Sequence, residues 1–141
     1  MHRQFRTTNA AHLGTLGIFR DFIDAACAES GLHPDICFAL KLAMDEACTN
    51  IIQHGYADMN PGSIILELEI DRDEAFLRIT DFGHPFEPIP TEAPDLQAAI
   101  EDRLIGGFGL FFIYSTMDAV DYHSDESGNT LTLTKKLTPD G

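Results

Sequence analysis

Three residues with catalytic potential follow one another at intervals of four within residues 45–56. They are Glu46, Asn50 and His54, and a helix that ends at Gly55 would carry all three along one line. Side chains at i and i+4 lie above one another on a helix surface. A carboxylate can activate a hydroxyl or a water molecule, and an amide oxygen can bind a hard cation. The row predicts such chemistry on one helix face, although a row of this kind also fits a solvated surface.

Two further segments carry residues suited to binding a nucleotide. Asp81 ends an expected strand and precedes a glycine turn at Gly83. Residues 106–110, Gly-Gly-Phe-Gly-Leu, form a flexible loop that opens a helix. There the backbone can approach phosphates closely, and the helix N-terminus favours negative charge. Each segment alone also fits a simple turn, so it is the order and spacing of all three that indicate a site.

Short motifs of other enzyme families are excluded by their context. Residues 81–83 spell the Asp-Phe-Gly of eukaryotic-type protein kinases, but the catalytic loop and the early glycine-rich loop of those kinases are missing. Residues 107–109 begin like a dinucleotide-binding fingerprint, but Phe112 takes the place of its last glycine. The sequence contains neither a P-loop nor a serine-hydrolase nucleophile motif.

The composition fits one domain that is large enough to bury a core. The chain has 141 residues, of which 44% are apolar and 23% are charged, and we predict a single domain over residues 1–141. The formal net charge of −14 argues against nucleic-acid binding, because phosphate neutralisation needs clustered Lys and Arg. An anionic ligand must therefore rely on backbone N–H groups, a helix N-terminus and a metal ion.

The cellular setting is also predicted from composition. No apolar run is long enough to cross a bilayer, and the N-terminal residues lack the core of a signal peptide, so we predict a cytoplasmic protein with no membrane partner. Cys27, Cys37 and Cys48 lie in helical patterns without a paired motif, which predicts reduced core residues. The histidines show no metal-ligand spacing, so a structural metal is not expected.

The periodicity predicts an α+β fold, a two-layer α/β sandwich with a mostly antiparallel sheet and helices on one face. We expect strands over residues 3–8, 63–71, 75–81, 119–123 and 129–137, and helices from an Asn9 cap to about Ser30 and from Pro34 to His54. Gly31 and Gly55 are the expected helix ends. The apolar stripe expected on the first helix is Leu13, Leu16, Ile18, Phe19, Phe22, Ile23 and Ala26. Prolines predict a loop over residues 82–94, and short helices are expected over 95–103 and 110–117.

The ordered motifs resemble the GHKL, or Bergerat-fold, ATP-binding superfamily. More closely, the chain resembles the bacterial anti-sigma-factor serine kinases. The family pattern E-A-x-x-N-x-x-x-H-G-Y is matched by residues 46–56, and D-x-G-x-P-F by residues 81–86. The glycine box with its following M-D is matched within residues 107–118, and G-x-x-L-x-L-x-K by residues 128–135. The resemblance covers nearly the whole chain.

The resemblance implies a role for each matched position. Glu46 would be the general base that polarises a seryl hydroxyl, and Asn50 would bind the Mg²⁺ that bridges the triphosphate of ATP. Asp81 would accept a hydrogen bond from the adenine amino group, and Gly83 would give room for the ring. Residues 87–106 would be a mobile ATP lid. The other nucleotide-binding positions implied are His54, Phe86, Gly106, Gly107, Gly109, Leu110 and Asn129.

Two positions depart from the family pattern. Many of these kinases carry Arg two residues before the first glycine of G-x-G, where Ile105 stands in this chain. Stabilisation of the phosphate charge in the transition state would then be weaker or come from another group. The usual Gly-Thr of the closing strand is replaced by Gly128-Asn129. The Asn129 amide can still form hydrogen bonds near adenine.

The resemblance implies an ATP- and Mg²⁺-dependent protein-serine/threonine kinase. It would phosphorylate a STAS-domain anti-anti-sigma protein and regulate a sigma factor by partner switching, and such kinases are commonly homodimers. Ile105 favours an alternative, a catalytically weak, ATP-gated binding module of the same fold. A third interpretation is an ATPase module detached from a larger sensor. A histidine kinase is disfavoured, because no helix with a phosphorylatable His precedes the domain.

Overall fold

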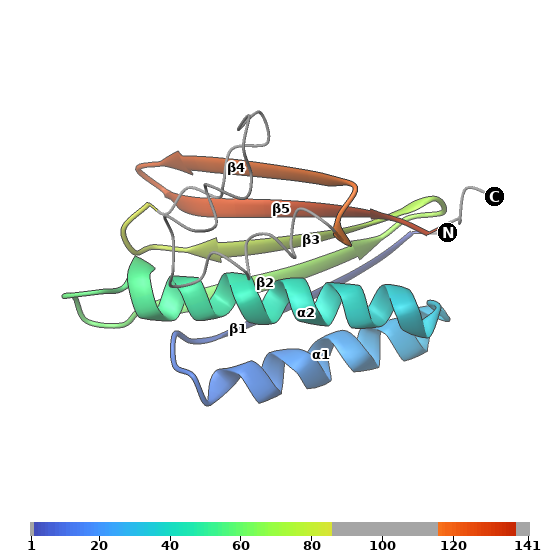
Figure 1. Ribbon diagram of the computed structural model, residues 1–141, viewed down its shortest axis with the longest axis horizontal. Helices are drawn as coiled ribbons and strands as arrows, with labels where there is room; N and C mark the ends of the chain where they lie inside the picture. Colours follow the sequence, from blue (N-terminus) through green and yellow to red (C-terminus); the bar gives the residue numbers. More distant parts are fainter. Residues whose placement is uncertain (1, 86–115, 138–141) are drawn as a thin grey trace.

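The computed structural model describes residues 2–85 and 116–137. In these residues five strands form one antiparallel sheet in the order β1-β2-β3-β5-β4, and two long helices lie on one side of it (Figure 1). The predicted α+β class is confirmed. The elements are β1 Arg3–Ala10, α1 Thr15–Ser30, α2 Pro34–Asn50, η1 Ile51–Gly55, β2 Ser63–Ile70, β3 Glu74–Asp81, β4 Ala119–Asp125 and β5 Gly128–Lys136.

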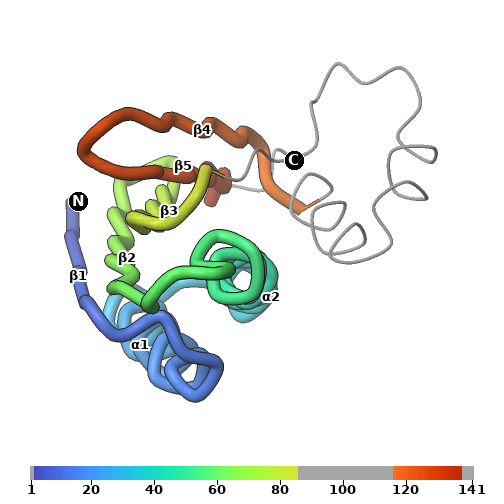
Figure 2. Tube along the Cα trace, turned by 90° about the vertical axis from the view of Figure 1, so that its left-hand side faces the viewer, coloured from blue at the N-terminus to red at the C-terminus, as the bar shows by residue number. Residues whose placement is uncertain are grey.

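The core is a single apolar layer between the sheet and the helices. Alternate residues of β2 from Ile64 to Ile70 are buried, as are Leu77 on β3 and Leu133 on β5. This period of two places one face of each strand in the core. Figure 2 shows the sheet curling around α1 and α2, which both lie on its concave side. The two helices of the described residues therefore cover the same face of the sheet.

The first helix begins later than predicted. Asn9 does not cap it but lies in β1 opposite Ile64, because the pairing of β1 with β2 continues to Ala10. The Asn9 side chain accepts a hydrogen bond from the Ala10 N–H, at 3.1 Å. Helix α1 starts only at Thr15. The predicted helix start was wrong because Asn9 and Ala10 pair with β2 instead.

The predicted apolar stripe of α1 is partly wrong. Leu13 precedes the helix and is half exposed, and Ile18 is 50% exposed because it lies on a flank of the helix that the sheet does not cover. The remainder is confirmed, with Phe19, Ile23 and Ala26 buried and with Leu16 and Phe22 packed against the core.

Helix α2 begins as predicted, with Pro34 as its first residue. The His33 Nδ1 atom accepts a hydrogen bond from the Asp35 N–H at 3.1 Å and so caps the helix. Gly31, with a φ of 68°, ends α1 in the left-handed conformation that glycine adopts without strain. The three cysteines are buried and free, as predicted.

The far end of α2 differs from the predicted regular helix. The α-helical part ends at Asn50, and Ile51–Gly55 form a π-helical turn in which the Tyr56 N–H donates to the Ile51 carbonyl at 3.0 Å. A π turn is wider than an α turn and is frequent at functional sites. His54 therefore leaves the line that Glu46 and Asn50 define.

The two predicted hairpins are confirmed, β2 with β3 and β4 with β5. Strands β4 and β5 are joined by a two-residue turn that ends at Gly128, whose φ of 132° requires glycine. The predicted loop from residue 86 on, the helix over 95–103 and most of the helix over 110–117 lie outside the described residues. None of the described helices has the length and apolar character that crossing a membrane requires.

Candidate nucleotide and metal site

Two of the three predicted segments meet at one end of the sheet. Asp81, at the end of β3, pairs with Asn129 at the start of β5. A Cβ atom on Gly55 would lie 3.7 Å from the Asp81 Oδ1 atom, so the π turn after α2 touches the same carboxylate. The glycine segment with Gly106, Gly107, Gly109 and Leu110, as well as Phe86 and the predicted lid, lies outside the described residues.

Asp81 is a buried carboxylate with a defined orientation. It is 4% exposed, and its Oδ1 atom accepts hydrogen bonds from the Gly83 N–H at 2.9 Å and from the Asn129 Nδ2 atom at 3.0 Å. Burial raises the pKa of Asp81, and these two hydrogen bonds offset part of that rise. Both bonds reach Oδ1, so within the described residues Oδ2 is the oxygen that remains for a ligand donor.

Asn129 holds this carboxylate in place. Its Nδ2 atom donates to the Asp81 Oδ1 atom and, at 2.9 Å, to the Gly83 carbonyl. Its Oδ1 atom accepts from the Ser124 Oγ atom at 2.6 Å. The amide is thus satisfied on both sides, and its orientation is determined. No sequence pattern pointed to Ser124, which lies opposite Asn129 in the register of the β4–β5 hairpin.

Gly83 lies against the π turn after α2. A Cβ atom on this residue would lie closer to the Gly55 carbonyl oxygen than real Cβ contacts allow. The next residue, His84, donates its backbone N–H to the same carbonyl. The turn after β3 is therefore fastened to the π turn after α2, and glycine is required at residue 83 for that contact.

Tyr56 also connects the segment after α2 to the end of β3, and no role was predicted for it from the sequence. Its hydroxyl donates to the Ser63 carbonyl at 2.8 Å and accepts from the Phe82 N–H at 2.9 Å. Burial raises the pKa of Tyr56, so the hydroxyl stays protonated and can make both bonds. Tyr56 is the last residue of the family pattern matched by residues 46–56, and that position could have indicated a role for it.

Asn50 is the exception among the buried polar residues here. It is 3% exposed, and its Nδ2 atom is buried without a hydrogen-bond partner in the part of the chain that the structure describes. An unsatisfied buried polar group costs about 1–3 kcal/mol. The free Nδ2 donor suits an acceptor such as a phosphate oxygen, and the amide oxygen is a suitable ligand for a hard divalent cation. The amide therefore fits the Mg²⁺–triphosphate role that the resemblance implied.

Glu46 lies one α-helical turn before Asn50, as predicted. The Glu46 side chain is half buried, whereas Asn50 is buried. Glu46 therefore lies nearer to solvent than Asn50 on the same helix. His54 is half buried in the π turn. Burial, together with the carboxylates of Asp45 and Asp81, raises the pKa of the Cys48 thiol. The same helix therefore lies within electrostatic reach of Asp81.

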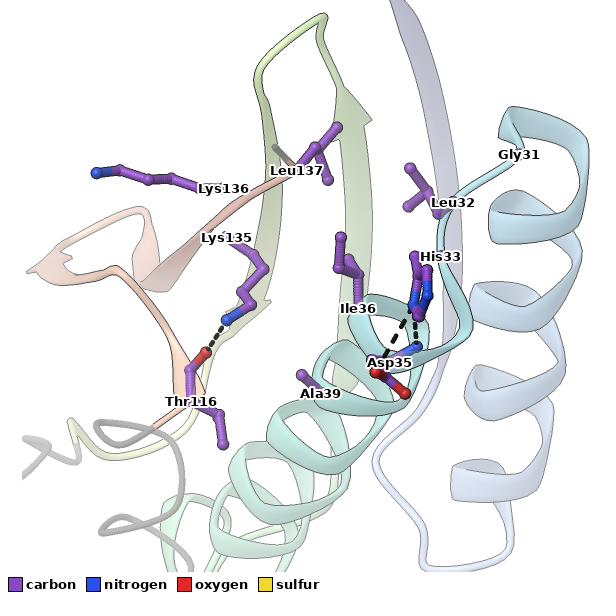
Figure 3. Close-up of a pocket in the computed structure, with 10 residues that line it drawn as sticks. All are labelled: Gly31, Leu32, His33, Asp35, Ile36, Ala39, Thr116, Lys135, Lys136 and Leu137. Atoms are coloured by element: carbon purple, nitrogen blue, oxygen red, sulfur yellow. Dashed lines mark hydrogen bonds and ion pairs between the residues drawn. The ribbon is translucent and has the colours of Figure 1, made fainter. Parts of the chain in front are cut away.

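A separate cavity of about 830 Å³ lies at the opposite, N-terminal end of α2 (Figure 3). No predicted site residue lines it. On one side the Lys135 Nζ atom donates to the Thr116 carbonyl at 2.7 Å, and on the other His33 caps α2. Its lining comprises Gly31, Leu32, His33, Asp35, Ile36, Ala39, Thr116, Lys135, Lys136 and Leu137. The predicted chemistry and this cavity occupy different ends of one helix.

The antiparallel sheet, the helices on one face and the acid at the end of β3 define an ATPase domain of the GHKL class. The chain belongs to the family described as histidine kinase-like ATPase domain, which matches residues 9–135. The predicted class of domain is therefore confirmed.

Individual relatives narrow this class. The chain is 35% identical to the serine/threonine-protein kinase BtrW of Bordetella bronchiseptica over 73% of its own length and 72% of the relative's. It is 31% identical to the serine-protein kinase RsbW of Bacillus velezensis over 86% and 78% of the two chains. It is 32% identical to the anti-sigma F factor of Clostridium beijerinckii over 69% and 68%. The predicted membership of the anti-sigma-factor kinases, and the enzyme class of ATP-dependent serine/threonine protein kinase, are confirmed.

Proposed function

We propose that this kinase transfers the γ-phosphoryl group of ATP to a seryl or threonyl hydroxyl of a STAS-domain anti-anti-sigma protein. In this proposal it also binds a sigma factor, and the bound nucleotide decides which partner it holds. The names of its relatives, which include a serine-protein kinase and an anti-sigma factor, support both halves of the proposal. The motifs of residues 46–56 and 81–86 support an ATP site in this chain.

The observation that carries the proposal is the buried amide of Asn50. A buried donor without a partner destabilises the protein, so the Nδ2 atom beside a half-buried carboxylate favours a ligand that carries acceptor oxygens, as a triphosphate does. Asn50 would hold Mg²⁺ through its amide oxygen. When bound, that ion neutralises phosphate charge, which an acidic protein with a net charge of −14 needs in order to hold a polyanion.

Glu46 acts as the general base in this scheme. One turn of helix separates it from Asn50, or about 6 Å along the axis. Its carboxylate takes the proton of the substrate hydroxyl while the hydroxyl oxygen bonds to the γ-phosphorus atom. The bond from that phosphorus to the bridging oxygen breaks, and ADP leaves. Asp81 accepts from the adenine amino group through Oδ2, and Gly83 leaves room beside the ring.

The direct test is phosphate transfer in vitro. The wild-type chain is mixed with ATP, MgCl₂ and the purified STAS-domain protein that is encoded nearest to it in its genome. Mass spectrometry should find one added phosphate on a Ser or Thr of that protein. The Glu46→Gln variant should show almost none, although it binds ATP normally. Transfer at the wild-type rate by this variant would contradict the role of Glu46.

A second candidate function is favoured by Ile105, which stands where many of these kinases carry Arg. In this alternative the chain binds ATP and releases or captures a partner without transferring phosphate. ATP-dependent binding of the STAS-domain protein with no added phosphate would establish it. The predicted homodimer and the cytoplasmic location stay predictions.

A further inference from the structure

The exposed side of α2 carries an apolar pair that the ATP chemistry does not use. Phe38 is 64% exposed, the highest value among the large exposed hydrophobic side chains of the described residues. Leu42, one turn further along, is half buried and is not part of the core cluster. A single exposed apolar residue is ordinary on a protein surface, but adjacent ones at helical spacing form a continuous patch. We call Phe38 and Leu42 the α2 patch.

The α2 patch lies on the same row of the helix as Glu46 and Asn50. Phe38, Leu42, Glu46 and Asn50 are spaced four residues apart within one regular α-helix. Such a row drifts around the helix by about 40° at each step, since each residue turns by about 100°. The drift leads from exposed Phe38 to buried Asn50, and Glu46 lies between them. The patch therefore adjoins the solvent side of the proposed base.

Two ion pairs lie beside the patch. Lys41 Nζ lies 2.8 Å from Asp24 Oδ1, and Arg20 Nη1 lies 2.8 Å from Asp45 Oδ1, both between α2 and α1. Each pair cancels its own charge, so these four side chains add no net charge beside the patch.

The distance to Glu46 identifies the occupant. Eight residues of α-helix span about 12 Å. A protein interface of ordinary size covers about 800 Å² on each partner, which as a disc has a radius of about 16 Å. A contact of this size that is centred on Glu46 would therefore extend to Phe38. Aromatic side chains are enriched in protein interfaces, so an exposed phenylalanine within this footprint suits such a contact.

We propose that the α2 patch is the docking surface for the folded protein substrate, and that Phe38 inserts into an apolar depression beside the acceptor hydroxyl. The proposal rests on the kinase function proposed above. It makes Phe38 a determinant of substrate specificity that touches neither ATP nor the reacting atoms. Loss of the contact should weaken capture of the substrate and leave the chemical step unchanged.

The chain offers a matched control on the other helix. Ile18 of α1 is 50% exposed. Arg20 of α1 reaches α2, and Ile18 lies two residues before it, about 200° away around the helix, so Ile18 points away from α2. Replacement of Ile18 by serine removes a similar exposed apolar side chain outside the proposed footprint.

The experiment compares wild type, Phe38→Ser, Phe38→Leu and Ile18→Ser in phosphate transfer to the purified STAS-domain protein, with ATP affinity measured in parallel. We expect Phe38→Ser to raise KM for the protein substrate at least tenfold, with kcat and the ATP Kd within twofold of wild type. Phe38→Leu should restore most of the affinity, and Ile18→Ser should behave as wild type. Phe38→Leu is the control for a general effect of substitution at residue 38, because it keeps an apolar side chain at the same position.

The possible failures are separable. If the wild-type chain transfers no phosphate, the proposed function fails and the docking surface fails with it. If wild type is active and Phe38→Ser keeps the wild-type KM, the docking surface alone is wrong. A wild-type KM in Phe38→Ser, together with loss of a dimer in light scattering, would overturn the proposal in favour of contact between two copies of this chain.

Discussion

The two halves of the candidate site differ in how far their polar groups are satisfied. At Asp81, hydrogen bonds from Gly83 and Asn129 fix the carboxylate, and Ser124 fixes the Asn129 amide in turn. At Asn50, the buried Nδ2 atom has no partner among the described residues. The half that we propose for adenine is therefore held by hydrogen bonds within the protein, whereas the half that we propose for Mg²⁺ is incomplete in its hydrogen bonding.

The largest expected effect is in the incomplete half. Glu46→Gln removes the proton acceptor and keeps the shape of the side chain. Because a general base acts mainly in the transition state, the rate of phosphate transfer should fall by about 10²–10⁴-fold while ATP affinity stays within about twofold. Single-turnover transfer and calorimetric ATP titration measure the two quantities. A parallel loss of both would mean that Glu46 helps to hold the nucleotide instead.

A smaller effect is expected in the half proposed for adenine. Asp81→Asn can keep both hydrogen bonds at Oδ1, but it replaces the Oδ2 acceptor by a donor. Facing the adenine amino group, that donor leaves a polar group unsatisfied at a cost of about 1–3 kcal/mol, or about 5–150-fold in ATP affinity. The wild-type preference for ATP over GTP should be lost in calorimetry. A variant that still prefers ATP as strongly as wild type would show that Asp81 does not contact the base.

The contact between Gly83 and the Gly55 carbonyl can be disrupted without changing a polar side chain. Gly83→Ala places a Cβ against the Gly55 carbonyl, so the free energy of unfolding should fall by about 1–3 kcal/mol. Gly17→Ala is the matched control. It lies within α1, where a new Cβ meets only the end of Arg20 at 4.0 Å, and it should stabilise the helix by about 0.5–1 kcal/mol. Urea unfolding of both variants checks the difference, and equal stability would contradict the close contact.

The smallest effect is on pH dependence. Burial raises the pKa of Asp81, so the folded protein binds this proton more tightly than the unfolded chain does. The resulting cost is absent below the ordinary pKa of 3.8 and is complete above the raised pKa. Asp81→Asn, which carries no charge, should therefore gain stability relative to wild type as pH rises through that window. Thermal unfolding between about pH 4 and pH 7 measures the difference. A difference that shrinks with rising pH would contradict the raised pKa.

Much of the fold could be predicted from the sequence because its signals are local. Pro34 and Gly31 mark helix boundaries by their own backbone preferences, and alternation marks β2 and β3. Asn9 was misassigned because the same residue type caps helices and also fits a strand end. Pairing with Ile64, a contact distant in sequence, decided between the two.

The site was predictable in its residue types but not in its connections. The row of Glu46 and Asn50 follows from helical spacing, whereas the π turn that displaces His54 accompanies the contact between Gly55 and Gly83. The bond from Ser124 to Asn129 depends on hairpin register, which no local pattern specifies. The roles of these residues towards ATP and Mg²⁺, and the extent of one domain over residues 1–141, stay predictions.

The central claim is that Asn50 binds Mg²⁺ through its amide oxygen, and ATP titrations with and without Mg²⁺ test it most directly. Asn50→Ala should fold as well as wild type, since the Nδ2 atom has no partner to lose and alanine is the better helix former. Mg²⁺ should lower the Kd of wild type for ATP. The Asp81→Asn variant should bind ATP more weakly than wild type, but Mg²⁺ should lower its Kd by the same factor. In Asn50→Ala, Mg²⁺ should change the affinity by less than about twofold. An Asn50→Ala variant in which Mg²⁺ tightens ATP binding as much as in wild type would contradict the account.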